Sequence, residues 1–285
     1  MISNSQKEEI RRALAEYVGK YKSQNKAAQS LKGTSAGTVS SILNGKDENI
    51  SDEMWLNIGS QVISLKSAGW QIVETKGFQE MVYAMKDAKE TNNCLWIVGE
   101  AGCGKTTTAR LYAEENKETF YIQCSEDMRK YDFVREVAKR IGVHTSGCTI
   151  RDMWSLIIDE LLTMDSPLII FDEADKLTER VFQYFINFYN QIEDKCGIVF
   201  FSTSYIERRI RNGLKYQKQG YEEIYSRLGR KFFRLVHTDA VDVASICKAN
   251  GLDDEKKIAK VLQEVEKCEY DLRRVKKSIR RELKG

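Results

Sequence analysis

The chain has 285 residues, of which 42% are hydrophobic and 31% are charged, and its formal net charge at pH 7 is +3. This length suits two modest domains or one large domain with an appendage. No apolar run approaches the roughly 20 residues of a membrane-spanning helix, and the charged, amphipathic start of the chain excludes a secretory signal. The 7 cysteines lack metal-ligand spacing and indicate reduced thiols. We therefore expect a cytoplasmic protein without a membrane partner.

Basic charge is concentrated in three segments of the chain. Residues 1–46 hold eight basic and three acidic residues, residues 205–235 hold nine and three, and residues 272–285 hold seven and one. Local positive fields of this kind attract polyanions such as nucleic acids. One such patch alone fits a solvated helix face equally well, but three patches together favour a nucleic-acid partner.

The first 66 residues show helical periodicity throughout. The apolar spacing predicts a helix around residues 10–17, a second around 27–31, a third over 36–43 and a fourth from about Ser51 to Leu65. A tight turn containing Gly33 separates the second helix from the third, which is typical of a helix-turn-helix domain that binds DNA. Residues 67–76 are the predicted linker that follows it.

The third predicted helix carries few side chains that can read bases. Val39, Ile42 and Leu43 form its apolar stripe, which leaves small residues on the outer face. Discrimination between bases usually requires Arg, Lys, Asn or Gln at the base edges. We therefore expect contacts with DNA phosphates and little sequence preference. The residues expected to make them carry basic or hydroxyl side chains: Lys26, Lys32, Thr38 and Lys46.

From about Gly77 the pattern changes to short apolar runs that alternate with amphipathic segments. The runs cover residues 94–98, 119–123, 167–172, 197–203 and 231–236. Near-continuous apolar strands separated by helices predict a parallel sheet covered on both faces, hence an α/β domain over residues 77–238. Residues 239–285 read as purely helical.

The strongest motif is GEAGCGKT at residues 99–106, between an apolar strand and a helix. It fits the phosphate-binding loop pattern G-x-x-x-x-G-K-[ST] in its required context. Glycines let the backbone N–H groups and the helix N-terminus face phosphates, Lys105 supplies a cation, and the Thr106 hydroxyl can ligate Mg²⁺. The predicted nucleotide-binding residues of this segment are consecutive: Gly99, Glu100, Ala101, Gly102, Cys103, Gly104, Lys105, Thr106 and Thr107.

Two further strands end in polar residues. In LIIFDEAD, at residues 168–175, Asp172 is predicted to hold Mg²⁺ through water and Glu173 to activate the attacking water. In FFSTS, at residues 200–204, the strand is expected between the two motif strands, with Thr203 as first choice and Ser204 as second for contact with the γ-phosphate. Together these residues predict hydrolysis of a nucleotide.

Several arginines and one lysine are candidates for coupling and for DNA binding. Arg227 lies just before the last strand and, like Arg230, cannot easily reach its own phosphate loop, so we predict that it acts on a neighbouring subunit's nucleotide. Arg273 could fold over the nucleotide from the helical end of the chain, although a solvated basic face explains that helix too. Further DNA contacts are expected from basic residues in loops and at helix starts: Arg129, Lys130, Arg208, Arg209 and Arg211.

With these residues assembled, the chain resembles the AAA+ ATPases, and among them the MuB transposition activators of Mu-type transposable phages. The segments GTVSSILNGK, GEAGCGKT, LIIFDEADKL, YSRLGRKF and DLRRVKKSIRR occur in that family's order. The resemblance implies a helix-turn-helix domain (1–66), a linker (67–76), an AAA+ core (77–238) and a helical lid (239–285). Insertion-sequence helpers and TnsC-like regulators share the ATPase motifs. The strand end STS departs from the family's pattern and leaves Ser202, Thr203 and Ser204 open as the sensor.

The resemblance also implies a function. Such proteins bind ATP with Mg²⁺, assemble into helical filaments on double-stranded DNA with little sequence preference, and stimulate a DDE transposase. ATP hydrolysis dismantles the filament, and the setting is the cytoplasm of a bacterial host. By resemblance, Lys105, Glu173, Thr203 and Arg227 take part in catalysis, and Arg273 couples the lid. Two other functions stay open: a transcriptional regulator with an ATPase switch, and a helicase loader or replication initiator.

Overall fold

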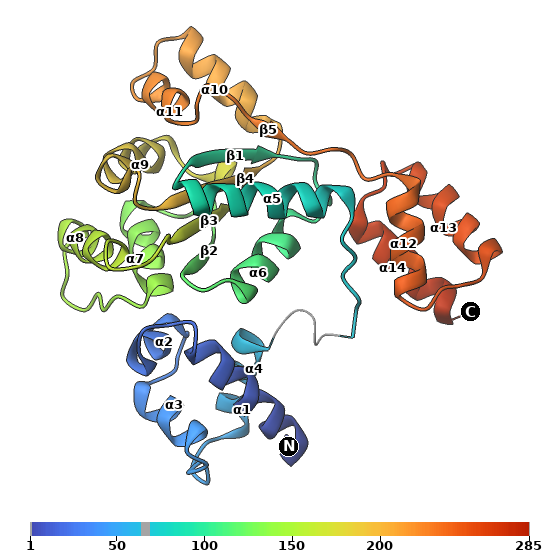
Figure 1. Cartoon of the computed structure of the whole chain (residues 1–285), viewed down its shortest axis with the longest axis horizontal. Helices are drawn as coiled ribbons and strands as arrows, with labels where there is room; N and C mark the ends of the chain where they lie inside the picture. The colour runs from blue at the N-terminus through green and yellow to red at the C-terminus, as the bar shows by residue number, and fades with distance from the viewer. Residues whose placement is uncertain (1, 64–68, 285) are drawn as a thin grey trace.

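The computed structural model describes residues 2–63 and 69–284 (Figure 1). Four helices come first, and a serine caps each of them by accepting a hydrogen bond from a backbone N–H of the first turn. Buried Leu14, Val39, Ile42, Trp55 and Ile58 form the core that these helices share. The helices are α1 (Asn4–Val18), α2 (Gln24–Ser30), α3 (Ala36–Leu43) and α4 (Asp52–Val62).

The fourth helix is shorter than the sequence predicts. It ends at Val62, where the backbone of the next residue, Ile63, is extended. The predicted helix end at residues 64–65 and the first two residues of the predicted linker, 67 and 68, lie outside the described part of the chain. The described remainder of the linker, from Gly69 to Thr75, has no regular secondary structure.

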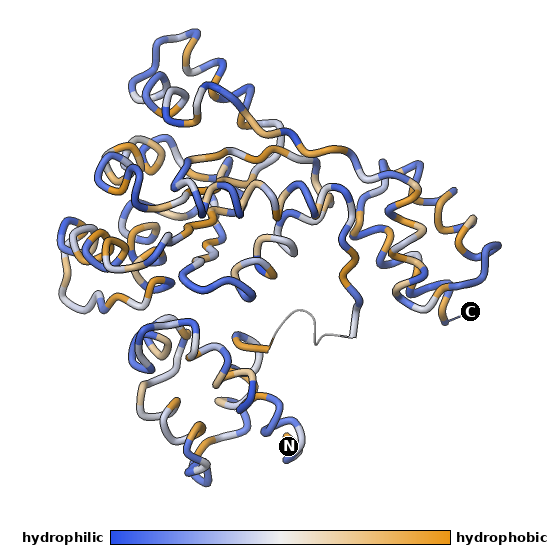
Figure 2. The backbone as a smooth tube through the Cα atoms, in the orientation of Figure 1, coloured by the Kyte–Doolittle hydropathy of each residue, from blue (hydrophilic) through white to orange (hydrophobic). Residues whose placement is uncertain are grey.

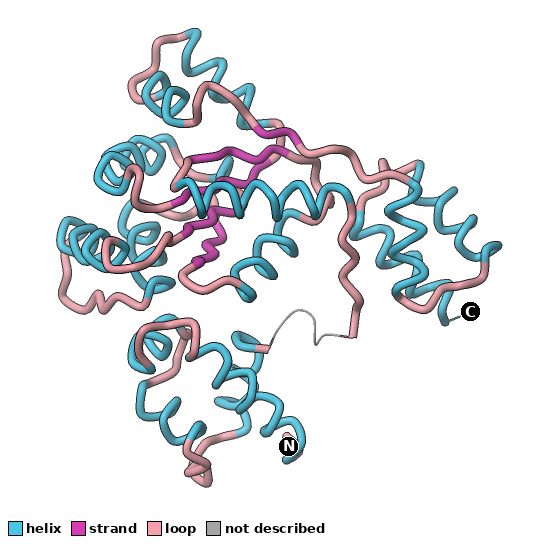
Figure 3. The backbone as a smooth tube through the Cα atoms, in the orientation of Figure 1, coloured by secondary structure: helices cyan, strands magenta, loops and turns pink. Residues whose placement is uncertain are grey.

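A five-stranded parallel sheet forms the centre of the molecule, in the order β2-β3-β4-β1-β5 (Figure 3). This confirms the predicted α/β fold with a five-stranded parallel sheet. The fourth strand lies between the two motif strands, as expected, so three chemically important strand ends meet at one edge. The strands are β1 (Cys94–Val98), β2 (Thr119–Gln123), β3 (Leu168–Asp172), β4 (Gly197–Ser202) and β5 (Phe233–Arg234).

The prediction of a fifth strand over residues 231–236 was too long. Only Phe233 and Arg234 pair with β1 in the regular ladder. The chain leaves the sheet soon afterwards because the backbone N–H of Val236 donates to the Glu80 carboxylate, at 2.9 Å, instead of to a strand carbonyl. The sheet therefore ends in a short edge that leads directly into the last helical region.

Helices cover both faces of the sheet because side chains alternate along each buried strand. On one face Trp96 and Phe200 stack beneath one group of helices, and on the other Ile97 and Phe201 pack against a second group. Figure 2 shows the hydrophobic colour running along the strands. The first face carries α7 (Lys130–Ile141), α8 (Ile150–Leu161), α9 (Glu179–Ile192), α10 (Tyr205–Lys215) and α11 (Tyr221–Arg227), and the second carries α5 (Lys76–Thr91) and α6 (Lys105–Glu115).

The chain closes with three helices that have a core of their own. Val243, Cys247, Val261 and Val275 are buried there. Figure 1 shows this group standing beside the sheet rather than on either of its faces. Its members are α12 (Ala240–Ala249), α13 (Glu255–Glu266) and α14 (Leu272–Lys284), and we refer to them as the lid helices. No helix in the described ranges is both long and apolar enough to span a membrane.

Candidate nucleotide-binding site

The loop between β1 and α6 owes its shape to glycine. Gly102 and Gly104 have φ angles of +81° and +94°, a left-handed conformation that side chains rarely adopt. A Cβ on Gly102 would also lie 2.3 Å from the Asp271 carboxyl carbon, and the Gly102 carbonyl accepts a hydrogen bond of 3.0 Å from the Leu272 N–H. The loop is thus joined directly to the first turn of α14.

Lys105 and Thr106 begin α6 at the end of this loop. The Lys105 ammonium donates to the carbonyls of Gly99 and Glu100, at 2.7 Å each, and lies 3.7 Å from the Cys103 sulfur. These contacts hold a cation within the loop at the positive end of the helix dipole, which suits a phosphate group. The predicted loop residues Ala101 to Thr107 all line one cavity of about 520 Å³, a size typical of a small-molecule site.

Asp172 ends β3 directly beside Thr106. Its carboxylate is fully buried and accepts hydrogen bonds from the Thr106 hydroxyl at 2.6 Å and from the Tyr121 hydroxyl at 2.9 Å. A hydroxyl and a carboxylate are hard oxygen ligands of the kind that Mg²⁺ accepts together with substrate phosphates. The donor set that the sequence predicts for Mg²⁺ therefore fits the ion. Burial raises the pKa of Tyr121, so its hydroxyl stays protonated as a donor.

Glu173 follows with a left-handed backbone, φ +55°. Its carboxylate accepts from Lys176 at 2.9 Å and from the Gln123 amide at 3.3 Å. Burial opposes ionisation, but these two donors and the nearby Arg273 together hold the pKa of Glu173 below its ordinary value. Glu173 is therefore ionised at neutral pH and can accept a proton.

Sequence reasoning missed the support that β2 gives to these acids. Gln123 ends β2, and its amide oxygen accepts from Arg110 at 2.9 Å, which orients its NH₂ group towards Glu173. Arg110 also lies over the Tyr121 ring, at 5.1 Å. The signal was available in principle, because Tyr121 and Gln123 point to the same face of β2 and parallel strands end at one edge.

The three hydroxyl residues at the end of β4, which the sequence left open as the sensor, have different surroundings. Ser202 is buried and its oxygen accepts from the Trp96 indole at 2.7 Å. Thr203 lines the cavity and donates to Asp175 at 2.7 Å. Ser204 is exposed and precedes α10. Ser202 lines the cavity as well, but its oxygen is engaged with the Trp96 indole, so Thr203 stays the predicted contact of a γ-phosphate.

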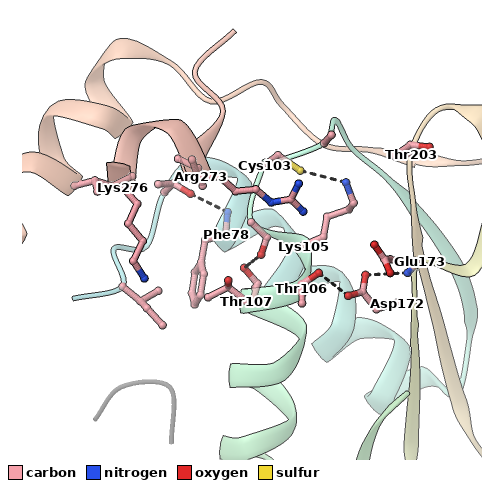
Figure 4. A pocket seen from close by; sticks show the side chains of 18 of the residues that line it. Phe78, Cys103, Lys105, Thr106, Thr107, Asp172, Glu173, Thr203, Arg273 and Lys276 are labelled. Carbon is pink, nitrogen blue, oxygen red and sulfur yellow. Dashed lines mark hydrogen bonds between the residues drawn. The ribbon is translucent and has the colours of Figure 1, made fainter. Parts of the chain in front are cut away.

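The lid helices and the described end of the linker close the other side of the cavity. Arg273 and Lys276 both line it, and Figure 4 shows the Arg273 guanidinium pointing towards the phosphate loop, whereas the Lys276 side chain points away from Asp172 and Glu173. Lys276 lies 5.0 Å from the centre of the Trp70 ring, and burial lowers the pKa of this lysine. Apolar side chains at this end offer a surface for a nucleobase: Trp70, Ile72, Val73, Phe78, Ile246 and Leu272.

Arg227 and Arg230 lie elsewhere. Arg227 ends α11 and donates to the Asn190 side chain of α9 at 2.9 Å and to the Glu223 carbonyl at 3.1 Å. Arg230 pairs with Glu222 at 2.6 Å. Neither belongs to the described residues that line the cavity. An action on the chain's own nucleotide is thus not supported by this arrangement, whereas the predicted action on a neighbouring copy stays a prediction.

Two of the residues predicted to contact DNA are engaged within the chain. Arg209 donates to the carbonyls of Asp175 and Leu177, at 3.2 and 2.7 Å, and lies over the Phe182 ring, so its guanidinium is engaged within the chain and its DNA contact stays a prediction. The guanidinium joins α10 to the turn after β3. Lys26 forms an ion pair with Glu160 of α8 and is not freely presented to DNA in this structure.

The other candidates remain on the surface at separate places. Lys32 and Lys46 are exposed, and the Thr38 hydroxyl shares a hydrogen bond with the capping Ser35. In the sheet domain the exposed residues are Arg129, Lys130, Arg208 and Arg211. Lys130 lies 4.9 Å from the Tyr184 ring, and Arg208 lies 5.2 Å from the Tyr205 ring. Their roles stay predictions.

Comparison with known proteins agrees with the geometry of this site. Residues 88–210 match the family model of an AAA domain. The chain is 24% identical over 255 residues to the ATP-dependent target DNA activator B of Escherichia phage Mu, covering 87% of this chain and 79% of the relative. The same figures hold for the protein of that name from Escherichia phage D108. The predicted resemblance to the MuB activators is thus confirmed.

Two solved structures are also similar in part. One is a DNA replication initiation factor, with a TM-score of 0.48 and 20% identity. The other is the replication initiator DnaA bound to AMPPCP and single-stranded DNA, with a TM-score of 0.49 and 18% identity. Each match covers 76% of this chain and 63% of the other, slightly less than two thirds of its length.

Proposed function

We propose that this chain is an AAA-type ATPase that uses ATP to assemble on double-stranded DNA as a helical filament with little sequence preference, and that delivers this DNA to a DDE transposase. The observation that carries the proposal is the contact of 2.6 Å between Thr106 and Asp172, with Glu173 ionised beside it and Arg273 across the cavity. Similarity to ATP-dependent target DNA activators over 87% of the chain supports the ATP and DNA parts, and the transposase part follows from the family resemblance.

The residues of the cavity have distinct tasks in this proposal. The loop N–H groups and Lys105 bind the β- and γ-phosphates, and Trp70 with Phe78 covers the base. Thr106 and Asp172 would hold Mg²⁺, which neutralises phosphate charge when it is bound. Glu173, which is ionised at neutral pH, accepts the proton of the attacking water. Thr203 contacts the γ-phosphate.

In this proposal Arg227 couples the nucleotide of one copy to its neighbour, and Arg273 couples the nucleotide to the lid helices of its own chain. Arg227 lies outside the chain's own cavity on α11, which supports an action in trans. An arginine supplied in trans can raise the rate of phosphoryl transfer by about 10³–10⁵. Arg273 approaches from α14, whose first residue is hydrogen-bonded to the phosphate loop, so occupancy of the loop can move the lid helices.

The surface of α3 supports binding without strong base readout. Its outer positions carry small residues, and the Thr38 hydroxyl shares a hydrogen bond with the capping Ser35. Contacts with phosphates supply affinity that is independent of sequence and falls with salt. Assembly of many copies then multiplies a weak contact.

The test is electron microscopy of the protein on random-sequence duplexes, with ATP or ADP, together with ATP turnover. The parent should coat DNA with ATP. Lys105→Ala should lose the coating, whereas Lys117→Ala, at an exposed lysine just past the other end of α6, should keep it. Glu173→Gln should retain the coats while turnover falls about 10²–10⁴-fold.

Other outcomes point to other functions. Coating by Lys105→Ala equal to that of the parent contradicts the proposal. A discrete protected site on otherwise bare DNA favours a transcriptional regulator. Binding to a replicative helicase without coating of DNA favours a helicase loader.

A further inference from the structure

The N-terminal helices contact the sheet domain on the side of α7 and α8, through side chains at the start of α2. The Tyr21 hydroxyl donates to the Arg140 carbonyl at 3.2 Å. The Lys22 ammonium donates to the Thr163 carbonyl and hydroxyl, at 2.6 and 2.7 Å. One helical turn later, the Lys26 ammonium pairs with the Glu160 carboxylate.

The backbone of α2 also lies directly on the end of α7. Gly142 caps α7 with a φ of +84°, and a Cβ there would be only 2.8 Å from the Lys26 carbonyl oxygen. Tyr21 packs against the large core of the sheet domain and is hydrogen-bonded to Tyr17. The contact is therefore close, although long polar side chains make most of it.

The acidic partner of Lys26 is incompletely satisfied. One Glu160 oxygen binds Lys26, while the other is buried and has no hydrogen-bond partner among the described residues. A half-satisfied buried carboxylate opposes the burial that docking requires. A contact built this way can be released when its lysines find another anion.

DNA is such an anion, and α2 is placed to meet it. In helix-turn-helix domains the first helix of the pair crosses the DNA backbone while the second enters the major groove. Here α2 and α3 form that pair; Lys22 lies just before the N-cap of the first helix and Lys26 lies in its first turn. In the described structure the Thr163 carbonyl and the Glu160 carboxylate occupy the positions that phosphate oxygens would take around these two ammonium groups.

We propose that the ends of α7 and α8 form an internal docking surface for α2, and that this surface and the phosphates of duplex DNA compete for the same face of α2. The inference rests on the proposed function, because it names how the DNA contact of that function is withheld and released. Lys32 and Lys46 stay exposed in the docked arrangement and can make the first contact with DNA. Binding then replaces Glu160 and Thr163 by phosphates.

The first test changes the docking surface and leaves every lysine of the N-terminal helices intact. Glu160→Arg should repel Lys26 and tighten binding of a random-sequence duplex in the presence of ATP. An increase of about tenfold is expected if one molecule in about ten is undocked in the parent, because affinity falls with the competent fraction. Asp159→Arg makes the same charge change at the exposed neighbouring position and should leave affinity nearly unchanged. Equal effects of the two substitutions overturn the inference.

The second test uses the unmodified chain. A carbodiimide joins an ammonium and a carboxylate in direct contact as an amide with loss of water, so it should link Lys26 to Glu160, as detected by mass spectrometry. Saturating duplex DNA should remove this cross-link and spare the Lys218–Glu179 cross-link, whose groups lie 3.2 Å apart within the sheet domain.

The outcomes separate the two proposals. A chain that binds DNA while the Lys26–Glu160 cross-link persists overturns the docking inference and leaves the proposed function standing. A chain that does not bind duplex DNA with ATP overturns the proposed function, and the docking inference with it.

Discussion

The lid helices and the N-terminal helices are both small helical groups, yet they meet the sheet domain in different ways. The lid reaches the phosphate loop by a backbone hydrogen bond from Leu272 to Gly102, and Arg273 lines the cavity. Its apolar core continues into Trp70 and Val73 of the linker, and Asn250 exchanges two hydrogen bonds with the Gln71 backbone. The N-terminal helices meet α7 and α8 instead, chiefly through Tyr21, Lys22 and Lys26.

Under the proposals above, this difference predicts which of the two regions responds to nucleotide and which to DNA. Backbone and apolar contacts hold the lid at the cavity, so we expect a change at the phosphate loop to move the lid. The contacts of α2 with α7 and α8 are polar, so salt ions or DNA phosphates can replace them. Three described residues of the linker, Trp70, Ile72 and Val73, line the cavity as well.

Gly102→Ala should lower ATP turnover more than Arg273→Ala or Lys22→Ala, since Gly102 lies at the contact between the phosphate loop and the lid. The new Cβ would lie 2.3 Å from the Asp271 carboxyl carbon at a φ of +81°, so either the loop must shift or the Asp271 carboxylate, which accepts from the Arg273 N–H, must leave its place at the start of α14. A displacement of about 1 Å can lower turnover by about 10², which a steady-state ATPase assay would detect. Gly147→Ala is the control, because Gly147 has a φ of +73° and no atom within 4 Å of the added Cβ. If both variants lose turnover equally, the lid contact is unimportant.

Arg273→Ala should have the next largest effect. The guanidinium faces the cavity, and loss of one charge-assisted hydrogen bond of about 1.5 kcal/mol corresponds to about a tenfold weaker binding of ATP. Fluorescent-nucleotide titration measures this. Arg274→Ala removes the same charge from the next residue, whose guanidinium binds Glu264 at 3.0 Å away from the cavity, and should bind ATP like the parent. Equal losses of ATP affinity in the two variants would show that the substitutions act through α14 as a whole rather than through a contact of Arg273 in the cavity.

In the absence of DNA, Lys22→Ala should change stability and ATP turnover less than the other two substitutions. Its ammonium is exposed and bonded to Thr163, and such surface contacts contribute about 0–1 kcal/mol. We expect a change in the free energy of unfolding within that range, measured by urea titration, and unaltered ATP turnover. A loss of turnover would show that the N-terminal helices act on the cavity directly, and the contrast between the two regions would then be wrong.

Local patterns were enough to predict most of the site. Lys105, Thr106 and Asp172 meet as expected, because a glycine-rich loop between strand and helix and a buried strand with an acidic end each have one common arrangement. The central place of β4 was also predicted correctly. The five-stranded sheet followed from runs of apolar residues that only a doubly covered sheet can bury.

Long-range contacts explain what the sequence could not show. Gln123 and Tyr121 act through residues about fifty positions away. Arg209 looked like one more exposed cation, but two carbonyls of the turn after β3 and the Phe182 ring satisfy it. Lys26 looked free for DNA because its partner, Glu160, lies far along the chain.

The phosphate loop, the acidic strand end and the order of helices and strands can be predicted from the chain alone, since these depend on glycine conformations and on the period of apolar residues. Which charges are free depends on the folded arrangement. A lysine or arginine has the same local signature whether it meets solvent, a carbonyl or a carboxylate, and folding alone brings Glu160 to Lys26 or Gln123 to Glu173.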